Sequence, residues 1–230
     1  MSACELATVT TYDTVLFDSD GVLVEPPARE TQVRATRDAF RAVGVTEPAP
    51  GHVDAVVDGV TVDSLTELCG DYDLDPEAFW AAREHHDEQS QLVAFRDGQR
   101  TRYDDVSVVA DLPCRRGVVS NNHHSTIEFV LDRFDLESVF ETAYGRPKTI
   151  ESLDLKKPNT HYLDRALADV DAESGLYVGD SQSDVVGAHR AGLDSVFVRR
   201  SHCRDISLDV EPTYEVESLA ALPDLLQPGN

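Results

Sequence analysis

The stretch Val15-Leu16-Phe17-Asp18-Ser19-Asp20-Gly21-Val22 decides the fold of this chain. Residues 14–17 are a short apolar run of the kind found in buried parallel strands, and the run ends directly at Asp18. Gly21 permits a sharp turn after the two carboxylates. Aspartates two residues apart at a strand end can do different work, because one can attack an electrophile while the other exchanges protons.

A second pair of carboxylates follows another apolar run. Residues 176–179 end in a glycine, Asp180 comes next, and Asp184 lies four residues further on. If a helix begins near Ser181, the two side chains share one face of that helix. Such oxygen ligands suit Mg²⁺, which takes one or two carboxylates and a phosphate oxygen and keeps several waters. The alternative interpretation is that both residues only cap and charge a helix N-terminus.

Two further segments carry groups that suit a phosphate. The apolar residues 117–119 lead to Ser120 and Asn121, whose hydroxyl and amide can hydrogen-bond an anion, although a simple turn is the competing interpretation. The chain has 17 arginines and three lysines, and two of those lysines, Lys156 and Lys157, stand side by side. This pairing indicates a task for a compact ammonium group, and chance is the alternative.

The periodicity of apolar residues divides the chain into two parts. Residues 26–95 form a mainly helical block, with helices expected at 29–43, 62–68 and 76–93. Strands and helices then alternate, with strands expected at 117–120, 139–143, 176–179 and 195–198 and helices at 125–134, 159–168 and 183–191. This alternation predicts an α/β fold with a parallel sheet, helices on both of its faces, and a ligand site outside the carboxyl ends of the strands.

Acidic residues greatly outnumber basic ones, 43 against 20, which gives a net charge of −23. They run along the whole chain rather than forming a tail, and their sign argues against a nucleic-acid partner. We interpret them as a surface adapted to molar salt, where self-repulsion is screened; a mesophilic acidic protein is the alternative. No apolar run is long enough to span a membrane, and the N-terminal residues carry no secretion signal, so we expect a cytoplasmic protein.

Cysteine and histidine spacing does not indicate a zinc site. The four cysteines stand far apart without a C-x-x-C pair, so reduced thiols are expected at Cys4, Cys69, Cys114 and Cys203. The pairs His85-His86 and His123-His124 have no convincing further ligands near them in the sequence. We interpret both pairs as solvated or helix-capping residues.

Taken in order, the four polar segments resemble the four motifs of the haloacid dehalogenase-like superfamily. Its D-x-D-G-V, strand-end Ser or Thr, Lys-Pro and G-D-S-x-x-D motifs are matched by Asp18 to Val22, Ser120, Lys157-Pro158 and Asp180 to Asp184. The resemblance covers nearly the whole chain and implies a Rossmann-like catalytic core made of residues 1–25 and 96–230. It also implies that residues 26–95 are an inserted helical cap of the first type, as in phosphoglycolate phosphatase-like members.

The resemblance implies a phosphatase and a role for each residue. Asp18 would attack phosphorus, while Asp20 would protonate the leaving group and then activate water. Ser120 and Asn121 would bind phosphoryl oxygens, and Lys157 would bind the phosphate and neutralise Asp18. The substrate would be a small phosphorylated metabolite, with no nucleic-acid or membrane partner, and the oligomeric state stays open.

The same resemblance implies a Mg²⁺ cofactor. The ion would lie on the carboxylates of Asp18 and Asp180 and on the backbone carbonyl of Asp20, with Asp184 as a ligand or as support for the ligands. A dehalogenase of the same superfamily is one alternative, but it lacks the second aspartate of the first motif, which is Asp20 here. A phosphomutase and a non-catalytic binding protein on this fold are the others, and the latter would be expected to have lost some of these residues.

Overall fold

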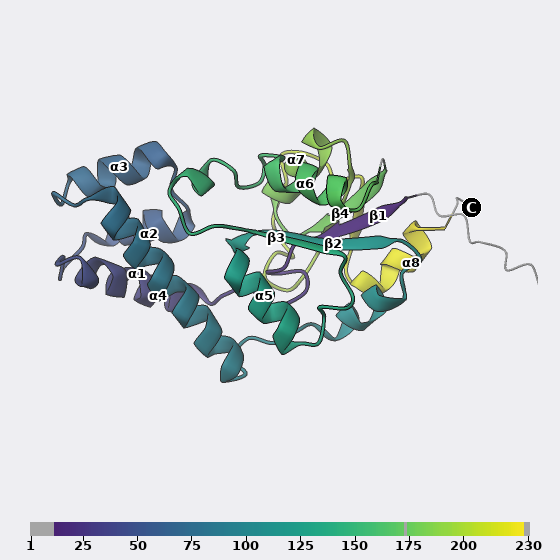
Figure 1. Ribbon diagram of the computed structural model, residues 1–230, viewed down its shortest axis with the longest axis horizontal. Coiled ribbons are helices and arrows are strands. Elements are labelled where there is room, and N and C mark those ends of the chain that lie inside the picture. The colour runs from purple at the N-terminus through teal and green to yellow at the C-terminus, as the bar shows by residue number, and fades with distance from the viewer. Residues whose placement is uncertain (1–11, 173, 228–230) are drawn as a thin grey trace, which may run out of the picture.

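A parallel sheet of six strands lies at the centre of the larger part of the molecule, in the order β3-β2-β1-β4-β5-β6 (Figure 1). The strands are β1 (Thr14–Phe17), β2 (Arg115–His123), β3 (Thr142–Arg146), β4 (Gly175–Gly179), β5 (Asp194–Val198) and β6 (Tyr214–Val216). Every neighbouring pair is parallel, which confirms the Rossmann-like α/β class expected from the sequence. The central strand β1 therefore has β2 on one side and β4 on the other.

The computed structural model describes residues 12–172 and 174–227. The N-terminal residues in which no secretion signal was found, 1–11, lie outside the described residues, and so does Cys4. The other three cysteines carry free thiols. Within the described part of the chain, no helix is long and apolar enough to cross a membrane.

Alternating residues of the strands bury two separate apolar layers. Val15 and Phe17 point into a layer completed by α5 (His124–Arg133), α8 (Leu222–Leu225) and the 3₁₀ helices Asp104–Asp111 and Leu219–Ala221. Leu16 points to the opposite face, against α6 (His161–Asp169) and α7 (Gln182–Arg190). Strands buried on both faces need helices on both sides, as the sequence predicted.

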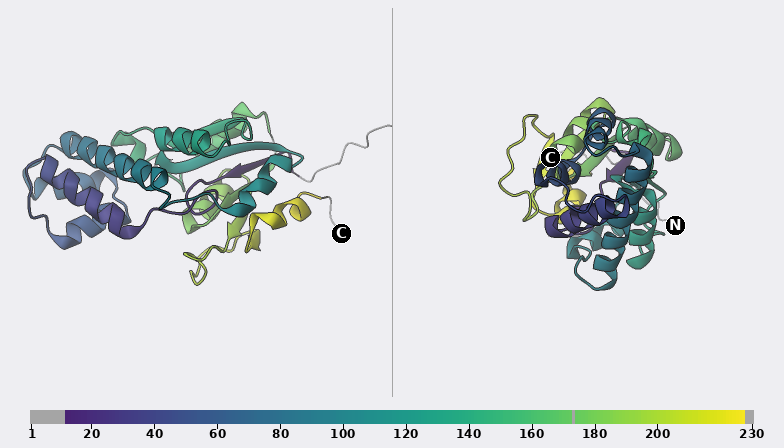
Figure 2. Two further views of the ribbon diagram at one scale, coloured as in Figure 1. Left: turned by 90° about the horizontal axis from the view of Figure 1, so that it is seen from below. Right: turned by 90° about the vertical axis from the view of Figure 1, so that its left-hand side faces the viewer.

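Four helices gather at one end of the molecule, away from most of the sheet (Figures 1 and 2). They are α1 (Arg29–Ala42), α2 (Pro50–Asp58), α3 (Val62–Gly70) and α4 (Pro76–Arg96). Asp75 caps α4 through its side chain, with Pro76 at the first helical position. Phe40, Phe79 and Trp80 belong to the apolar cluster of these helices, which also takes in Ile150 and Leu153 from the segment after β3.

Most predicted elements are present, with boundaries that differ by a few residues. The strand expected at 139–143 is instead Thr142–Arg146, because Val139 and Phe140 turn into the core before the strand begins. The helix α2, the edge strand β6 and the 3₁₀ helix Glu151–Leu153 were not predicted. These elements are short, and a short element gives too few periods to recognise in a sequence.

Candidate active site

Three neighbouring strands bring the motif residues to one edge of the sheet. Asp18 follows β1, Ser120 lies near the end of β2, and Asp180 follows β4. Since β2, β1 and β4 are adjacent and parallel, their carboxyl ends meet at one place, where ligands bind in sheets of this kind. Lys157 reaches the same place from the loop before α6.

Asp18 lies in an anionic, nearly dry environment. Its side chain accepts a hydrogen bond from the Ser19 backbone at 2.7 Å, and Lys157 Nζ lies 3.2 Å from its Oδ1. Burial raises the pKa of Asp18 to about 7; Lys157 opposes the increase, while Asp184 and Asp180 add to it. Burial of the charged form is therefore the main cost at Asp18, and the neighbouring carboxylates add to it.

Lys157 is held in place on all sides. It is 5% exposed, and its Nζ lies 2.8 Å from Asp184 Oδ1 and donates to the Val119 carbonyl at 3.1 Å and to the Tyr177 hydroxyl. Burial by itself lowers the pKa of Lys157, but the charges of Asp18 and Asp184 outweigh it and raise the pKa above its ordinary value. The ammonium group therefore stays charged beside Asp18.

The donor set at this edge fits a hard divalent cation. Carboxylate oxygens of Asp18, Asp180 and Asp184 all lie within 4.8 Å of one another. Burial is the main reason why the pKa of Asp180 is raised, and Asp184 raises it further. A cation placed among these oxygens would remove that repulsion, and all-oxygen ligation is what Mg²⁺ prefers.

Both carboxylate oxygens of Asp184 already interact with other residues of the protein. Its Oδ2 accepts hydrogen bonds from the backbone N–H of Asp180 at 3.2 Å and from the N–H and Oγ of Ser181 at 3.0 and 2.6 Å. Its Oδ1 faces Lys157. This geometry fits a residue that fixes the loop carrying Asp180 better than a direct ligand.

The backbone at Gly21 passes close to the Asp180 carboxylate. Gly21 has a φ of +78°, and a Cβ added there would lie 1.8 Å from Asp180 Oδ2. His202 Nε2 lies 2.6 Å from the same oxygen and would lie 2.9 Å from the added Cβ. Only a glycine lets the turn after Asp20 approach Asp180 this closely.

The side chain of Asp20 is oriented by two donors that the sequence did not indicate. Arg100, 3% exposed, donates to Asp20 Oδ1 at 2.7 Å, and Asn122 Nδ2 donates to Oδ2 at 2.8 Å. Both donors also contact Gln91 Oε1, at 2.9 and 2.7 Å. Arg100 lies between α4 and the 3₁₀ helix Asp104–Asp111, where no local pattern marks it, and only the tertiary structure brings it to Asp20.

Asn121 makes contacts different from those expected. Its side-chain oxygen accepts from the Lys157 backbone N–H at 2.7 Å, and its Nδ2 donates to the Lys157 carbonyl at 3.2 Å. The amide therefore anchors the loop that carries Lys157, and phosphate contact by Asn121 stays a prediction. The register of β2 against β3 shifts between Val119 and His123, which directs successive side chains to different partners.

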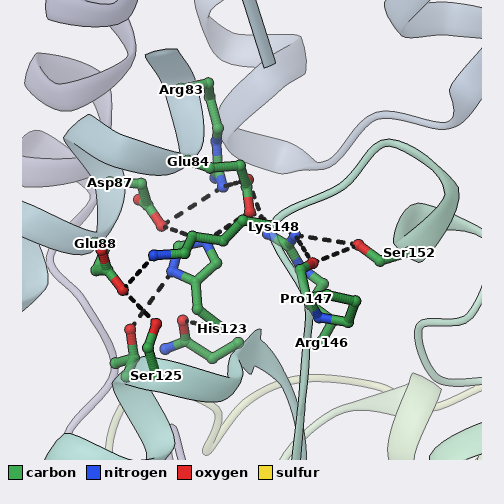
Figure 3. A network of polar contacts seen from close by, with 12 residues as sticks. Arg83, Glu84, Asp87, Glu88, His123, Ser125, Arg146, Pro147, Lys148 and Ser152 are labelled. Atoms are coloured by element: carbon green, nitrogen blue, oxygen red, sulfur yellow. Dashed lines mark hydrogen bonds and ion pairs between the residues drawn. The ribbon is translucent and has the colours of Figure 1, made fainter. Parts of the chain in front are cut away.

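His123 occupies the N-cap position of α5, although its side chain makes no capping hydrogen bond, and the interpretation of His123 as solvated is wrong. His123 is fully buried, and its Nε2 lies 2.8 Å from Glu84 Oε2 on α4 (Figure 3). Arg146 makes two further contacts with Glu84, at 2.6 and 3.0 Å, and Arg83 makes one at 2.8 Å. The periodicity of the sequence did not indicate this network. A packed helix is recognised by a stripe of apolar residues, whereas the face that α4 buries here is polar.

A cavity of about 280 Å³ lies between the strand ends and residues of α1, α2 and α4. Asp18, Asp20 and Ser120 line it at the strand ends, with Arg146 of β3. Trp80 and Arg83 line it from α4, and Lys156 lines it from the loop before α6. Arg29, Arg34 and Arg41 of α1 do not line this cavity but a separate hollow on that helix. Burial, followed by the charges of Arg146 and Arg83, lowers the pKa of Lys156 to about 8.

The fold and this site define a class of Rossmann-like α/β proteins with an aspartate at the end of the first strand. The haloacid dehalogenase-like hydrolase family matches residues 15–198, and the chain belongs to this family. A curated relative, pyrophosphatase PpaX of Bacillus mycoides, is 32% identical over 117 residues, which is 50% of each protein. The chain thus spans about half the length of the curated relative it matches.

Solved structures show the same fold. CbbY of Rhodobacter sphaeroides in complex with xylulose-(1,5)bisphosphate is 17% identical, with a TM-score of 0.72 over 95% of this chain and 100% of the other. A HAD-superfamily hydrolase, subfamily IA, of Geobacter sulfurreducens is 17% identical, with a TM-score of 0.60 over 96% of this chain and 99% of the other. At this level of identity the likeness establishes the fold alone.

Proposed function

We propose that this protein is a Mg²⁺-dependent phosphatase that hydrolyses a small phosphomonoester through a phosphorylated Asp18. The convergence of Asp18, Asp20 and Lys157 at one edge of the sheet carries the proposal. The names of the relatives support it, since one is a pyrophosphatase and another was solved with a bisphosphate.

In the first step a carboxylate oxygen of Asp18 bonds to phosphorus as the ester P–O bond breaks. Lys157 balances the charge of the nucleophile, and Ser120, which lines the same cavity, donates to a phosphoryl oxygen. Asp20 gives its proton to the leaving oxygen. In the second step Asp20 takes a proton from water, which attacks phosphorus and releases Asp18.

The carboxylates of Asp18 and Asp180 and the backbone carbonyl of Asp20 would hold the cation. When bound, Mg²⁺ supplies positive charge that stabilises the transferring phosphoryl group. The fit rests on the clustered carboxylate oxygens and on the raised pKa values of Asp18 and Asp180, for which burial is the main cause. Asp184 supports the cluster through Ser181 and Lys157.

We also propose that residues 26–95 act as a cap on a core made of residues 1–25 and 96–230, and that closure excludes water during the first step. The two connections between these parts run side by side. Glu25 N donates to the Thr101 carbonyl at 3.0 Å, and Tyr103 N donates to the Leu23 carbonyl at 3.1 Å. Paired linkers of this kind suit a hinge.

The division of labour between the two aspartates provides the test. Asp18→Asn removes the nucleophile, so no phosphoenzyme should form and turnover should fall to background. Asp20→Asn removes the acid and the base, each worth about 10²–10⁴-fold, but keeps the nucleophile. An aryl phosphate barely needs the acid, so this variant should show a burst and gain the mass of one phosphoryl group.

Two outcomes would contradict the proposal. The first is that both variants behave alike or that the label maps to a residue other than Asp18. The second is full activity of the wild-type protein after all divalent ions are removed by a chelator, which would refute the metal assignment while leaving the nucleophile in place.

A further inference from the structure

The loop that follows β5 returns to the carboxylate cluster at the end of β4. Arg200 fixes the start of this loop, because it makes a bidentate ion pair with Asp105 at 2.7 and 2.8 Å and donates to the Val22 carbonyl at 2.8 Å. His202 and Cys203 follow Arg200 by two and three residues. The chemistry proposed for phosphoryl transfer uses neither of these two side chains.

Three different kinds of ligand atom meet at this point. A carboxylate oxygen of Asp180, a ring nitrogen of His202 and the sulfur of Cys203 all lie within 4.8 Å of one another. His202 Nε2 lies 2.6 Å from Asp180 Oδ2, and the Cys203 side chain is buried. His202 and Cys203 are neighbours in the sequence, but Asp180 precedes His202 by 22 positions, so the spacing along the chain does not reveal this group.

The ligand types distinguish this group from the cluster of Asp18, Asp180 and Asp184. That cluster offers only oxygen, which suits Mg²⁺, whereas oxygen, nitrogen and sulfur together are ligands of Zn²⁺ and similar borderline cations. Bonds of about 2.0–2.3 Å to a tetrahedral ion place ligand atoms roughly 3.3–3.8 Å apart. Shifts of roughly 1 Å reach this geometry, and the exposed ring of His202 makes such a shift without repacking the core.

The present contacts of these side chains are weak enough to be replaced by a cation. The Cys203 thiol donates to the Val198 carbonyl at 3.3 Å, and an S–H group is a weak donor. Its proton would pass to solvent when the sulfur binds a metal ion, as metal binding to a thiol requires. The charge of a divalent ion would then offset the thiolate and the Asp180 carboxylate together.

We propose that Asp180, His202 and Cys203 bind a borderline divalent cation of the Zn²⁺ class, with water completing its coordination. This site shares Asp180 with the proposed Mg²⁺ site. Two divalent cations on one carboxylate repel each other, so an ion at one site weakens binding at the other. Binding itself does not depend on the proposed phosphatase function, whereas its effect on turnover does.

Co²⁺ is a suitable probe, because it accepts the ligands of Zn²⁺ and a thiolate bound to it absorbs in the near ultraviolet. One equivalent of Co²⁺, added to the wild-type protein with Mg²⁺ and a phosphine reductant, should produce this band, and Zn²⁺ should remove it. Cys203→Ser should abolish the band, whereas Cys114→Ser, which removes another free thiol, should keep it. No band in the wild-type protein, or equal bands in the two variants, would overturn the proposal.

A second variant covers the case in which Cys203→Ser does not fold. His202 is exposed, so His202→Gln leaves the core intact. The Kd for Zn²⁺, measured by competition with a chromophoric chelator, should rise at least tenfold in this variant. His85→Gln, which removes an exposed histidine of α4, should leave the Kd unchanged. Equal Kd values for the wild-type protein and His202→Gln would show that carboxylates alone bind Zn²⁺ and would refute the site.

Turnover separates this proposal from the phosphatase function. With an aryl phosphate and Mg²⁺, Zn²⁺ should inhibit the wild-type protein, and Cys203→Ser should raise the Zn²⁺ concentration for half-inhibition at least tenfold. Equal inhibition of both proteins would refute the sharing of Asp180. If no ester is hydrolysed but the Co²⁺ band depends on Cys203, the phosphatase proposal fails and the metal site stands. If esters are hydrolysed but the band is absent, the metal site fails and the phosphatase proposal stands.

Discussion

Gly21 has no Cβ, and this leaves room for the Asp180 carboxylate beside the turn that follows Asp20. In Gly21→Ala the new Cβ would collide with Asp180 Oδ2, 1.8 Å away, and the φ of +78° would add strain. A displacement of about 1 Å at reacting groups can cost about 10²-fold in rate, so we expect Mg²⁺-dependent turnover to fall at least that far. Steady-state kinetics on an aryl phosphate measures the loss.

The control is Gly98→Ala, in the linker after α4. Gly98 has a similar φ of +71°, but a Cβ there would meet nothing within 4 Å. It should show only the backbone strain, about 1–2 kcal/mol in the free energy of unfolding, and should keep its turnover. If the two variants lose equal activity, strain rather than collision with Asp180 is responsible.

At the scale of the element, helix α4 is held to the core by charge. Burial raises the pKa of Glu84, but hydrogen bonds from His123 and Arg146, with the charges of Arg146 and Arg83, outweigh it and leave the pKa below its ordinary value. Glu84 therefore contributes stability above the pKa of an unfolded glutamate, about 4.3. That contribution is lost as the pH falls through the folded pKa.

Glu84→Gln should lower the free energy of unfolding at pH 7 by about 3–5 kcal/mol, because it leaves buried cations without their counter-charge. The difference from the wild-type protein should shrink at pH 3, and urea unfolding at both pH values measures it. Glu67→Gln, on the exposed face of α3, should change stability by less than about 0.5 kcal/mol. A difference for Glu84→Gln that does not depend on pH would show that packing, not charge, holds the helix.

At the scale of the whole molecule, the net charge of −23 opposes compaction. Screening should weaken this repulsion, because the Debye length falls from about 10 Å at 0.1 M salt to about 3 Å at 1 M. We therefore expect the thermal unfolding midpoint to rise as KCl increases from 0.1 M to 2 M. A midpoint indifferent to KCl over this range would contradict the interpretation of a surface adapted to molar salt, and would leave the catalytic proposal untouched.

The parallel sheet and the segments that meet at its edge can be predicted from local sequence alone. Buried strands are apolar and end at recognisable polar residues, so the sequence suffices to place Asp18 and Asp180 at strand ends and Ser120 in the last part of β2. Parallel strands bring such ends together whatever the rest of the chain does. The boundaries of β3 and the presence of α2 and β6 could not be predicted, because short elements leave weak periodic signals.

Which polar residues work together depends instead on tertiary packing. Arg100 reaches Asp20 across 80 positions of the sequence, and Glu84 reaches Arg146 across 62. Such pairs leave no periodic trace, because a single long-range contact does not depend on spacing along the chain. For the same reason the sequence pattern misplaces His123, which is buried against α4. The local sequence pattern thus determines the strands and their ends. The packing of α4 against the core determines which of its side chains line the cavity.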